Sequence, residues 1–188
     1  MDKITEVKQL INEINCLHSK FSNDYFETGK IEKINLSKTI THVPIENIYK
    51  YRLTLHESIN DYLMIANIDI RYFYRVKTRE SIDDKIKRFS SRDEQYPVNN
   101  WLNDIFGVRI ILTAPEIKIV MDLLDDWQNE FNLKNWYLQD KDCYRGLGLH
   151  IYFKNKNNFY FPWELQIWDA LDINTNIQNH EKFKRNFV

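Results

Sequence analysis

The sequence predicts an α+β fold in which a mixed β-sheet of about five strands is flanked by helices. Two apolar stretches with helical spacing open the chain, strand-like and helix-like segments alternate in its middle, and three strand-like segments precede a last helix. The length of 188 residues and the 43% hydrophobic content suit one domain with a packed core. We expect a single domain over 1–188, with an N-terminal helical part over 1–66 and the sheet over 67–188.

The N-terminal part is predicted to form two helices. Apolar residues recur at helical spacing through 3–22. Pro44 suits the first turn of a second helix that runs to about Ala66. The polar residues 23–43 between them are typical of a loop with at most a short strand.

The sheet is predicted to begin with a strand over 67–78, followed by a helix over 81–91. Ser81 is the expected N-cap of that helix, with Asp84 in the capping-box position. A helical turn over 99–103 and a strand over 106–112 come next.

The remaining elements follow from caps and alternation. Thr113 and Glu116 form a capping box for a helix whose apolar stripe runs to Phe131. Alternating and aromatic-rich patterns predict three further strands, at 135–140, 149–154 and 159–167. The last helix opens at Asp169 or Asp172 and carries three basic side chains, His180, Lys182 and Lys184.

Charge and composition restrict the kind of partner. The net charge of −1 argues against a general polyanion binder, so we expect no DNA partner and look for local charge clusters. The chain has no stretch of 18 apolar residues and no signal-peptide core, so we expect a cytoplasmic protein without a membrane span. Its two cysteines, Cys16 and Cys143, lack metal-ligand spacing and are expected to be reduced thiols.

A cationic strand–helix segment is the first candidate site. Strand alternation places Arg75 and Lys77 on one face. Helical spacing places Ser81, Lys85 and Arg88 on one stripe. Cations beside a helix N-terminus suit a polyphosphate, whereas a solvated basic face is the alternative.

Asp104 and Arg109 form the second candidate site, around the start of the strand over 106–112. A carboxylate at a strand mouth suits Mg²⁺, which takes one or two carboxylates and leaves other positions to phosphate and water. The alternative is a helix-terminal Asp with a surface Arg.

The segment from Tyr144 to His150 is the third candidate. An exposed Tyr144 offers a stacking face for a base, and Arg145 or His150 could bind phosphate. The alternative is a strand entry loosened by Gly146 and Gly148.

Glu164 and Gln166 are the fourth candidate, because they share one face of an otherwise apolar strand. A carboxylate in that position can deprotonate a hydroxyl or ligate a metal. The alternative is an edge strand with a polar outer face.

Taken in order, these segments resemble the synthetase domain of the RelA/SpoT family, the (p)ppGpp synthetases. The resemblance covers about residues 50–185 and includes Arg75-x-Lys77-x₃-Ser81-Ile82-x₂-Lys85-x₂-Arg88, Asp104-x₂-Gly107-x-Arg109 and Glu164-Leu165-Gln166-Ile167. It implies a nucleotidyltransferase-like synthetase fold and the transfer of pyrophosphate from ATP to the 3′-hydroxyl of GTP or GDP. Without a His-Asp hydrolase motif, the chain resembles a small stand-alone synthetase.

The resemblance also implies roles for the candidate residues. The ATP phosphates would be held by Arg75, Lys77, Ser81, Lys85 and Arg88. Asp104 would bind Mg²⁺, and Glu164 would activate the 3′-hydroxyl or share the metal, supported by Gln166. On the acceptor side, Tyr144 would stack on the base, and the phosphates would be contacted by Arg145, His150 and Arg109.

The chain departs from the family pattern in the acceptor segment. The family usually has a Tyr four residues before the His, whereas here that position is Gly146 and Tyr144 lies six residues before His150. Either two residues are inserted, or the stacking Tyr is absent. Trp168-Asp169 stands where the family has Arg-Thr. Two alternatives therefore stay open: the same chemistry on another acceptor, such as an adenosine nucleotide or a tRNA 3′ end, or a non-catalytic nucleotide-binding regulatory domain. A homo-oligomer also stays open.

Overall fold

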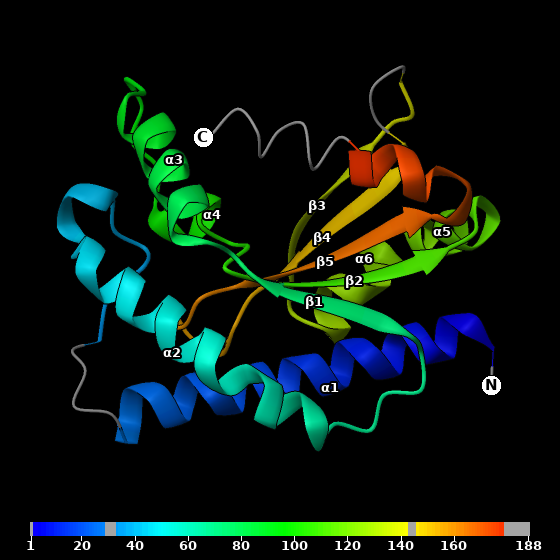
Figure 1. Ribbon diagram of the computed structural model, residues 1–188, viewed down its shortest axis with the longest axis horizontal. Coiled ribbons are helices and arrows are strands. Elements are labelled where there is room, and N and C mark those ends of the chain that lie inside the picture. Colours follow the sequence, from blue (N-terminus) through cyan, green and yellow to red (C-terminus); the bar gives the residue numbers. More distant parts are fainter. Residues whose placement is uncertain (1, 29–32, 143–145, 179–188) are drawn as a thin grey trace.

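The structure is a computed structural model, and it describes residues 2–28, 33–142 and 146–178. The predicted α+β fold is confirmed (Figure 1): a mixed five-stranded sheet has the order β1-β2-β5-β4-β3. The strands are β1 (Tyr72–Val76), β2 (Phe106–Leu112), β3 (Leu133–Gln139), β4 (Gly148–Phe153) and β5 (Trp163–Asp169). Only β2 and β5 pair in parallel, and the other neighbours are antiparallel.

The helices are α1 (Lys3–Asn23), α2 (Ile45–Met64), α3 (Arg79–Ser90), α4 (Val98–Trp101), α5 (Ala114–Asp122) and α6 (Leu124–Glu130). A π-helix at Asp24–Thr28 and a 3₁₀ turn at Ile40–His42 occupy the described part of the segment predicted as loop or short strand. The last described residues form a 3₁₀ turn at Ala170–Asp172 and a helix over 173–178. Asp169 caps this turn by accepting from the Leu171 N–H, as expected for the opening of the last helix. The predicted basic residues at 180, 182 and 184 lie outside the described residues.

One face of the sheet forms the core. Alternate side chains of β2 and β5, Val108, Ile110, Leu165 and Ile167, are fully or almost fully buried. Helix α1 reaches this face through Asn15, whose amide oxygen accepts from Trp163 Nε1 at 2.8 Å. Helices α5 and α6 contact β5 and β3, so the amphipathic helices cover the apolar face.

The opposite face of the sheet is polar. Cross-strand pairing aligns its side chains in one row made of Arg75, Gly107, Glu164, Tyr152 and Asn135. The next row is made of Phe73, Arg109, Gln166, His150 and Tyr137. Residues far apart in the sequence therefore share one surface, which α3 and α4 flank at one end (Figure 1).

Three predicted boundaries were wrong. Helix α3 is capped by Thr78, not Ser81, because the chain is still extended at Thr78 and its hydroxyl accepts from the Ser81 N–H. Strand β1 begins at Tyr72, and the carbonyl of Asn67 accepts from Gln9 of α1 rather than from a strand. Strand β5 begins at Trp163, directly after Pro162, which has no N–H to give to a sheet ladder.

The capping box of Thr113 and Glu116 is confirmed, but the helix it opens is interrupted at Leu123 and continues as α6. Cys16 is a free thiol, and Cys143 lies outside the described residues. Every helix in the described parts of the chain is too short or too polar to cross a membrane.

Candidate active site

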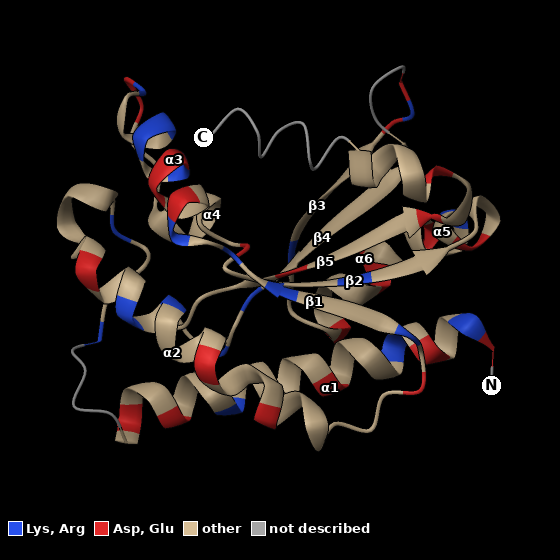
Figure 2. Cartoon of the chain, in the orientation of Figure 1, with Lys and Arg blue, Asp and Glu red and all other residues tan. Residues whose placement is uncertain are grey.

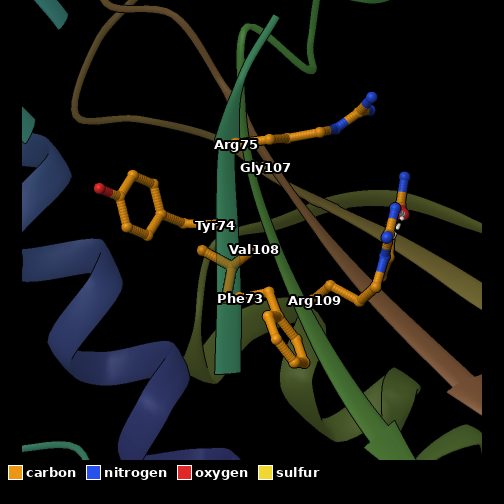
Figure 3. A pocket seen from close by; sticks show the side chains of 7 residues that line it. Phe73, Tyr74, Arg75, Gly107, Val108 and Arg109 are labelled. Atoms are coloured by element: carbon orange, nitrogen blue, oxygen red, sulfur yellow. Dashed lines mark hydrogen bonds between the residues drawn. The ribbon is translucent and has the colours of Figure 1, made fainter. Parts of the chain in front are cut away.

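Arg75 lies on the edge strand β1 and links two carboxylates of the polar face. It projects from β1 across Gly107 of β2, on the same side of the sheet as Arg109, while Tyr74 points the other way (Figure 3). A Cβ at Gly107 would lie 3.2 Å from Arg75 Nε, so glycine gives the guanidinium room to cross the strand. The predicted alternation of β1 is thus confirmed, and it carries Arg75 towards two carboxylates.

Asp104 is the first of these carboxylates. It lies just before β2, is 7% exposed, and accepts from Lys77 Nζ at 2.6 Å and from Lys85 Nζ at 2.9 Å. Arg75 Nη2 lies 3.6 Å from its Oδ2. Asp104, the acid predicted just before the strand, is therefore bound by cations from β1, from the segment after it and from α3. Figure 2 shows this basic stretch where β1 leads into α3.

Glu164 is the second carboxylate, and it is 2% exposed on β5. Its Oε2 accepts from Arg75 Nη2 at 3.1 Å and from Gln166 Nε2 at 2.8 Å. Its Oε1 accepts from the Tyr152 hydroxyl at 3.0 Å and lies 2.9 Å from His150 Nδ1. Because an ionised carboxylate can only accept, Nδ1 carries the proton of the His150 ring. All of these partners lie on strands, which makes Glu164 a rigidly held anion.

The cations keep both acids ionised. Burial alone raises the pKa of Asp104, but the charges of Lys85 and Lys77 outweigh it and the net pKa is lowered. For Glu164, burial is likewise overcome by the His150 hydrogen bond and the Arg75 charge, so its pKa also lies below the usual range. Burial lowers the pKa of Lys77 despite its ion pair, since Lys85 and Arg75 repel it.

Arg109 completes the cationic side of the cluster. It donates to Gln166 Oε1 at 2.7 Å, and its guanidinium carbon lies 3.4 Å from the centre of the Trp168 ring. Burial, assisted by the charge of Arg75, lowers its pKa to about 10, so it remains a cation at neutral pH. Four cations, Arg75, Lys77, Lys85 and Arg109, thus surround two buried carboxylates, an excess of positive charge that suits an anionic ligand.

The other two predicted phosphate ligands lie further out. Arg88 donates to Asp84 at 2.7 Å and its side chain is 61% exposed. Ser81 lies in the first turn of α3, where its hydroxyl accepts from Thr78 at 3.0 Å. Neither residue contacts the two buried carboxylates through a described hydrogen bond or ion pair, so the structure divides the predicted set into an inner and an outer group.

The donor set has the chemistry that a divalent cation needs. Arg75 Nη2 lies within 3.1 Å of a Glu164 oxygen and 3.6 Å of an Asp104 oxygen, so the two carboxylates converge on one positively charged group. Two carboxylates are what Mg²⁺ takes from a protein when phosphate completes its shell. Within the described residues no cluster of three or more acidic, His or Cys side chains could hold a metal by itself.

The acceptor segment differs from expectation at Gly146. A Cβ there would lie 2.3 Å from Asp172 Cβ, so no side chain fits at this position. Asp172 accepts from the Leu147 N–H at 2.9 Å, and Asn176 accepts from the Gly146 N–H at 3.0 Å. The residues after β5 therefore fill the space beside Gly146. The predicted Tyr144 and Arg145 lie outside the described residues.

Two tyrosines of the polar face were not predicted. Tyr152 binds Glu164, and Tyr137 of β3 stacks on His150 with ring centres 4.4 Å apart and planes 9° apart. Both line a cavity of about 370 Å³, together with Lys85, Phe89, Arg92, Tyr96, Asn100, Trp101, Asn103 and Asn135. Strand alternation in 148–152 puts Tyr152 on the face of His150, and that signal could have identified it, whereas Tyr137 shares this face through the register of β3 with β4.

The fold and the site define an α+β protein in which two buried carboxylates lie beside several cations on the polar face of the sheet. No family model matches the chain, and no curated protein sequence matches it. Among solved structures, the chain is similar to a GTP pyrophosphokinase family protein from Streptococcus pneumoniae, with 20% identity over 74% of this chain and 73% of that one and a TM-score of 0.44.

It is also similar to the small alarmone synthetase 1 from Bacillus subtilis, with 21% identity over 77% of each chain and a TM-score of 0.38. That synthetase has also been solved bound to its product pppGpp, and this structure is 20% identical over 76% of each chain with a TM-score of 0.37.

Proposed function

We propose that the protein transfers a pyrophosphoryl group from ATP to the 3′-hydroxyl of a nucleotide acceptor, with GTP or GDP as the first candidates. The observation that carries the proposal is the pair of buried carboxylates, Asp104 and Glu164, held in ion pairs with three cations on one face of the sheet. Five residues of the motifs that resemble the RelA/SpoT synthetases meet in this cluster, although they lie far apart in the sequence: Arg75, Lys77, Lys85, Asp104 and Glu164.

The reaction requires an in-line arrangement and neutralisation of negative charge. The acceptor 3′-oxygen attacks the β-phosphorus of ATP, the bond from that phosphorus to the α,β-bridging oxygen breaks, and AMP leaves. Such transfers depend on positioning and electrostatics more than on covalent catalysis. The inner cations Arg75, Lys77 and Lys85 would hold the donor phosphates, and Ser81 and Arg88 would hold their outer end.

Asp104 and Glu164 would hold Mg²⁺ together with those phosphates. The ion supplies charge neutralisation and orientation of the phosphate oxygens. Polyphosphate oxygens would then replace Asp104 as partners of Lys77 and Lys85, an exchange of one anion for another. His150, Tyr152 and Gln166 keep the Glu164 carboxylate fixed on β5.

Glu164 would accept a hydrogen bond from the 3′-hydroxyl and take its proton as the new bond forms. The low pKa of this carboxylate makes it a weak base before attack, which fits a reaction in which the hydroxyl needs orientation more than early deprotonation. The proton would pass to Glu164 late, when the attacking oxygen has become acidic.

The acceptor base would enter the 370 Å³ cavity. This volume lies in the usual range for small-molecule sites. The cavity is lined by aromatic rings, amides and cations, and it meets the carboxylate cluster at Lys85 and Tyr152. Since no side chain fits at Gly146, we assign the stacking platform to Tyr137, whose ring is 47% exposed.

The test incubates the protein with γ-labelled ATP, Mg²⁺ and one acceptor at a time: GTP, GDP, ATP or tRNA. Label on GTP or GDP supports the first candidate. Asp104→Asn and Glu164→Gln are expected to abolish transfer while nucleotide binding survives, and Asp125→Asn on α6 is the control for the same chemical change outside the site. Transfer at the unmutated rate in either site variant would remove that residue from its proposed role.

A second candidate keeps the chemistry and changes the acceptor to an adenosine nucleotide or a tRNA 3′ end. The observation in its favour is Gly146, because this position, four residues before His150, has no room for a side chain beside Asp172 and Asn176. Label recovered only in a new 3′-pyrophosphorylated adenosine nucleotide, separated from the ATP donor, or only on tRNA would establish it. Binding without transfer to any acceptor would favour the non-catalytic regulatory reading.

Tyr137 is tested against its neighbour in β3. Tyr137→Ala is expected to raise the KM for the acceptor roughly 10-fold or more, because stacking on an aromatic ring contributes about 1–3 kcal/mol per base. The KM for ATP should stay unchanged, and Tyr137→Phe should restore the acceptor KM. Trp136→Ala, at a similarly exposed ring on the other face, is the control. An unchanged acceptor KM in Tyr137→Ala would refute the assignment.

A further inference from the structure

A second cavity lies beyond Arg109 on the polar face. Its volume is about 610 Å³, and neither Asp104 nor Glu164 lines it. Its apolar lining comes from Ile70, Phe73, Ile111, Trp168, Ile173 and Ile177. The helix over 173–178 contributes two of these side chains, so the last described helix forms one wall of a groove over β1, β2 and β5.

Among the described residues, the charged lining of this groove is cationic. It consists of Lys3, Arg71 and Arg109, and no carboxylate of the described part of the chain lines the groove. Lys3 is also paired with Glu6 at 2.7 Å, and Arg109 is bound to Gln166. Arg71 makes no ion pair with the described residues, and its guanidinium carbon lies 5.5 Å from the centre of the Phe73 ring. Arg71 is thus the cation best placed to meet a ligand charge.

We propose that this groove binds a small amphiphilic anion, with its apolar body on Phe73 and Ile177, which are 49% and 45% exposed, and its anionic head at Arg71. The charge of the lining favours an anionic head, because a cationic head would meet three positive side chains, of which Arg71 makes no ion pair with the described residues. The apolar lining selects the body, because an inorganic anion would leave Ile173 and Ile177 in contact with water. The size of the groove suits a chain or ring system of a fatty acid's dimensions.

The ligand is proposed as a free molecule rather than a lipid in a membrane. The lining side chains come from α1, β2, β5, the helix over 173–178 and the region of β1, so a bound body lies among several elements rather than on one flat face. The site is independent of the proposed transferase activity, since binding needs neither Asp104 nor Glu164.

The test is calorimetric titration of the full chain with dodecanoate below its micelle-forming concentration. We expect one site and a negative heat-capacity change, the mark of buried apolar surface. Acetate tests the head alone and dodecanol tests the body alone, and both should bind at least 10-fold more weakly. Arg71→Gln is expected to weaken dodecanoate roughly 10-fold without weakening dodecanol, the size of one charge-assisted hydrogen bond.

Ile177→Glu tests the location of the site. It should weaken dodecanoate strongly by placing a negative charge in the groove, whereas Leu171→Glu adds the same charge to a side chain that is 87% exposed and does not line the groove. Equal dodecanoate affinity in the two variants would overturn the proposal. It would also be overturned by binding only to vesicles of phosphatidylglycerol, or by a dimer that Ile177→Glu dissociates and dodecanoate leaves intact.

Discussion

Asp104→Asn should separate the structural role of the carboxylate from its role in phosphate binding. In the folded chain Asp104 is the counter-charge of Lys77 and Lys85, whose side chains are only 11% and 16% exposed. Asparagine keeps the shape but removes the charge, so two largely buried ammonium groups lose their anion. Breaking a buried ion pair in this way costs about 3–5 kcal/mol.

That loss should lower the melting temperature by roughly 6–20 °C, because each kcal/mol shifts Tm by about 2–4 °C in a chain of this size. Thermal unfolding followed by circular dichroism measures it, with Asp125→Asn as the control. The same variant should bind inorganic tripolyphosphate roughly 10-fold more tightly, since Lys77 and Lys85 are released from competition with Asp104. Tripolyphosphate should also restore much of the lost stability.

The stability that Asp104 contributes should also depend on pH. The pKa of Asp104 is lowered in the folded state, so its contribution to stability is present above the unfolded-state pKa of about 3.9 and is lost as pH falls through the lower folded-state value. The stability difference between the unmutated chain and Asp104→Asn should therefore be full at pH 7 and shrink below about pH 4. A variant as stable as the unmutated chain at pH 7, with weaker tripolyphosphate binding, would refute the counter-charge role.

Two glycine predictions follow from the space around the backbone. Gly146→Ala should destabilise the chain by about 1–3 kcal/mol, because its Cβ would lie 2.3 Å from Asp172 Cβ. Gly148→Ala, with its nearest atom at 3.4 Å, is the control in the same unfolding assay, and equal losses would contradict the packing. Gly107→Val should leave the fold intact but displace Arg75 and lower the transfer rate, and a normal rate in the label-transfer assay would speak against Arg75 as a donor ligand.

Local patterns predicted the parts of the site that lie within single elements. Strand alternation was enough to place Arg75 with Lys77, and Glu164 with Gln166, on shared faces. It could not show that Lys77 and Lys85 meet the same carboxylate, because that contact depends on how α3 turns back over the start of β2. A local capping rule also chose Ser81 where the extended backbone at Thr78 decides the start of α3.

The acceptor side of the site was harder to predict from the sequence, because its residues are brought together by the order of the strands in the sheet. β5 lies between β2 and β4, so Glu164 is paired with Gly107 on one side and Tyr152 on the other. No spacing in the sequence expresses that insertion, and Tyr137 becomes relevant only through its register with His150. The sequence shows that Gly146 departs from the family pattern. It does not show that the Asp172 side chain fills the space beside Gly146, because Asp172 lies on a segment that follows another strand.

The ion pairs between the inner cations and the two carboxylates also affect how the site could bind ATP. Every inner cation already faces a carboxylate, and Arg75 alone spans both acids, at 3.1 Å from Glu164 and 3.6 Å from Asp104. A planar guanidinium can keep one partner while giving another to a phosphate, which a lysine ammonium does less well. Arg75 could therefore remain bound to Glu164 while Lys77 and Lys85 pass from Asp104 to the donor. In that arrangement phosphate binding frees Asp104 for a metal ion without releasing Glu164 from the strand that orients it.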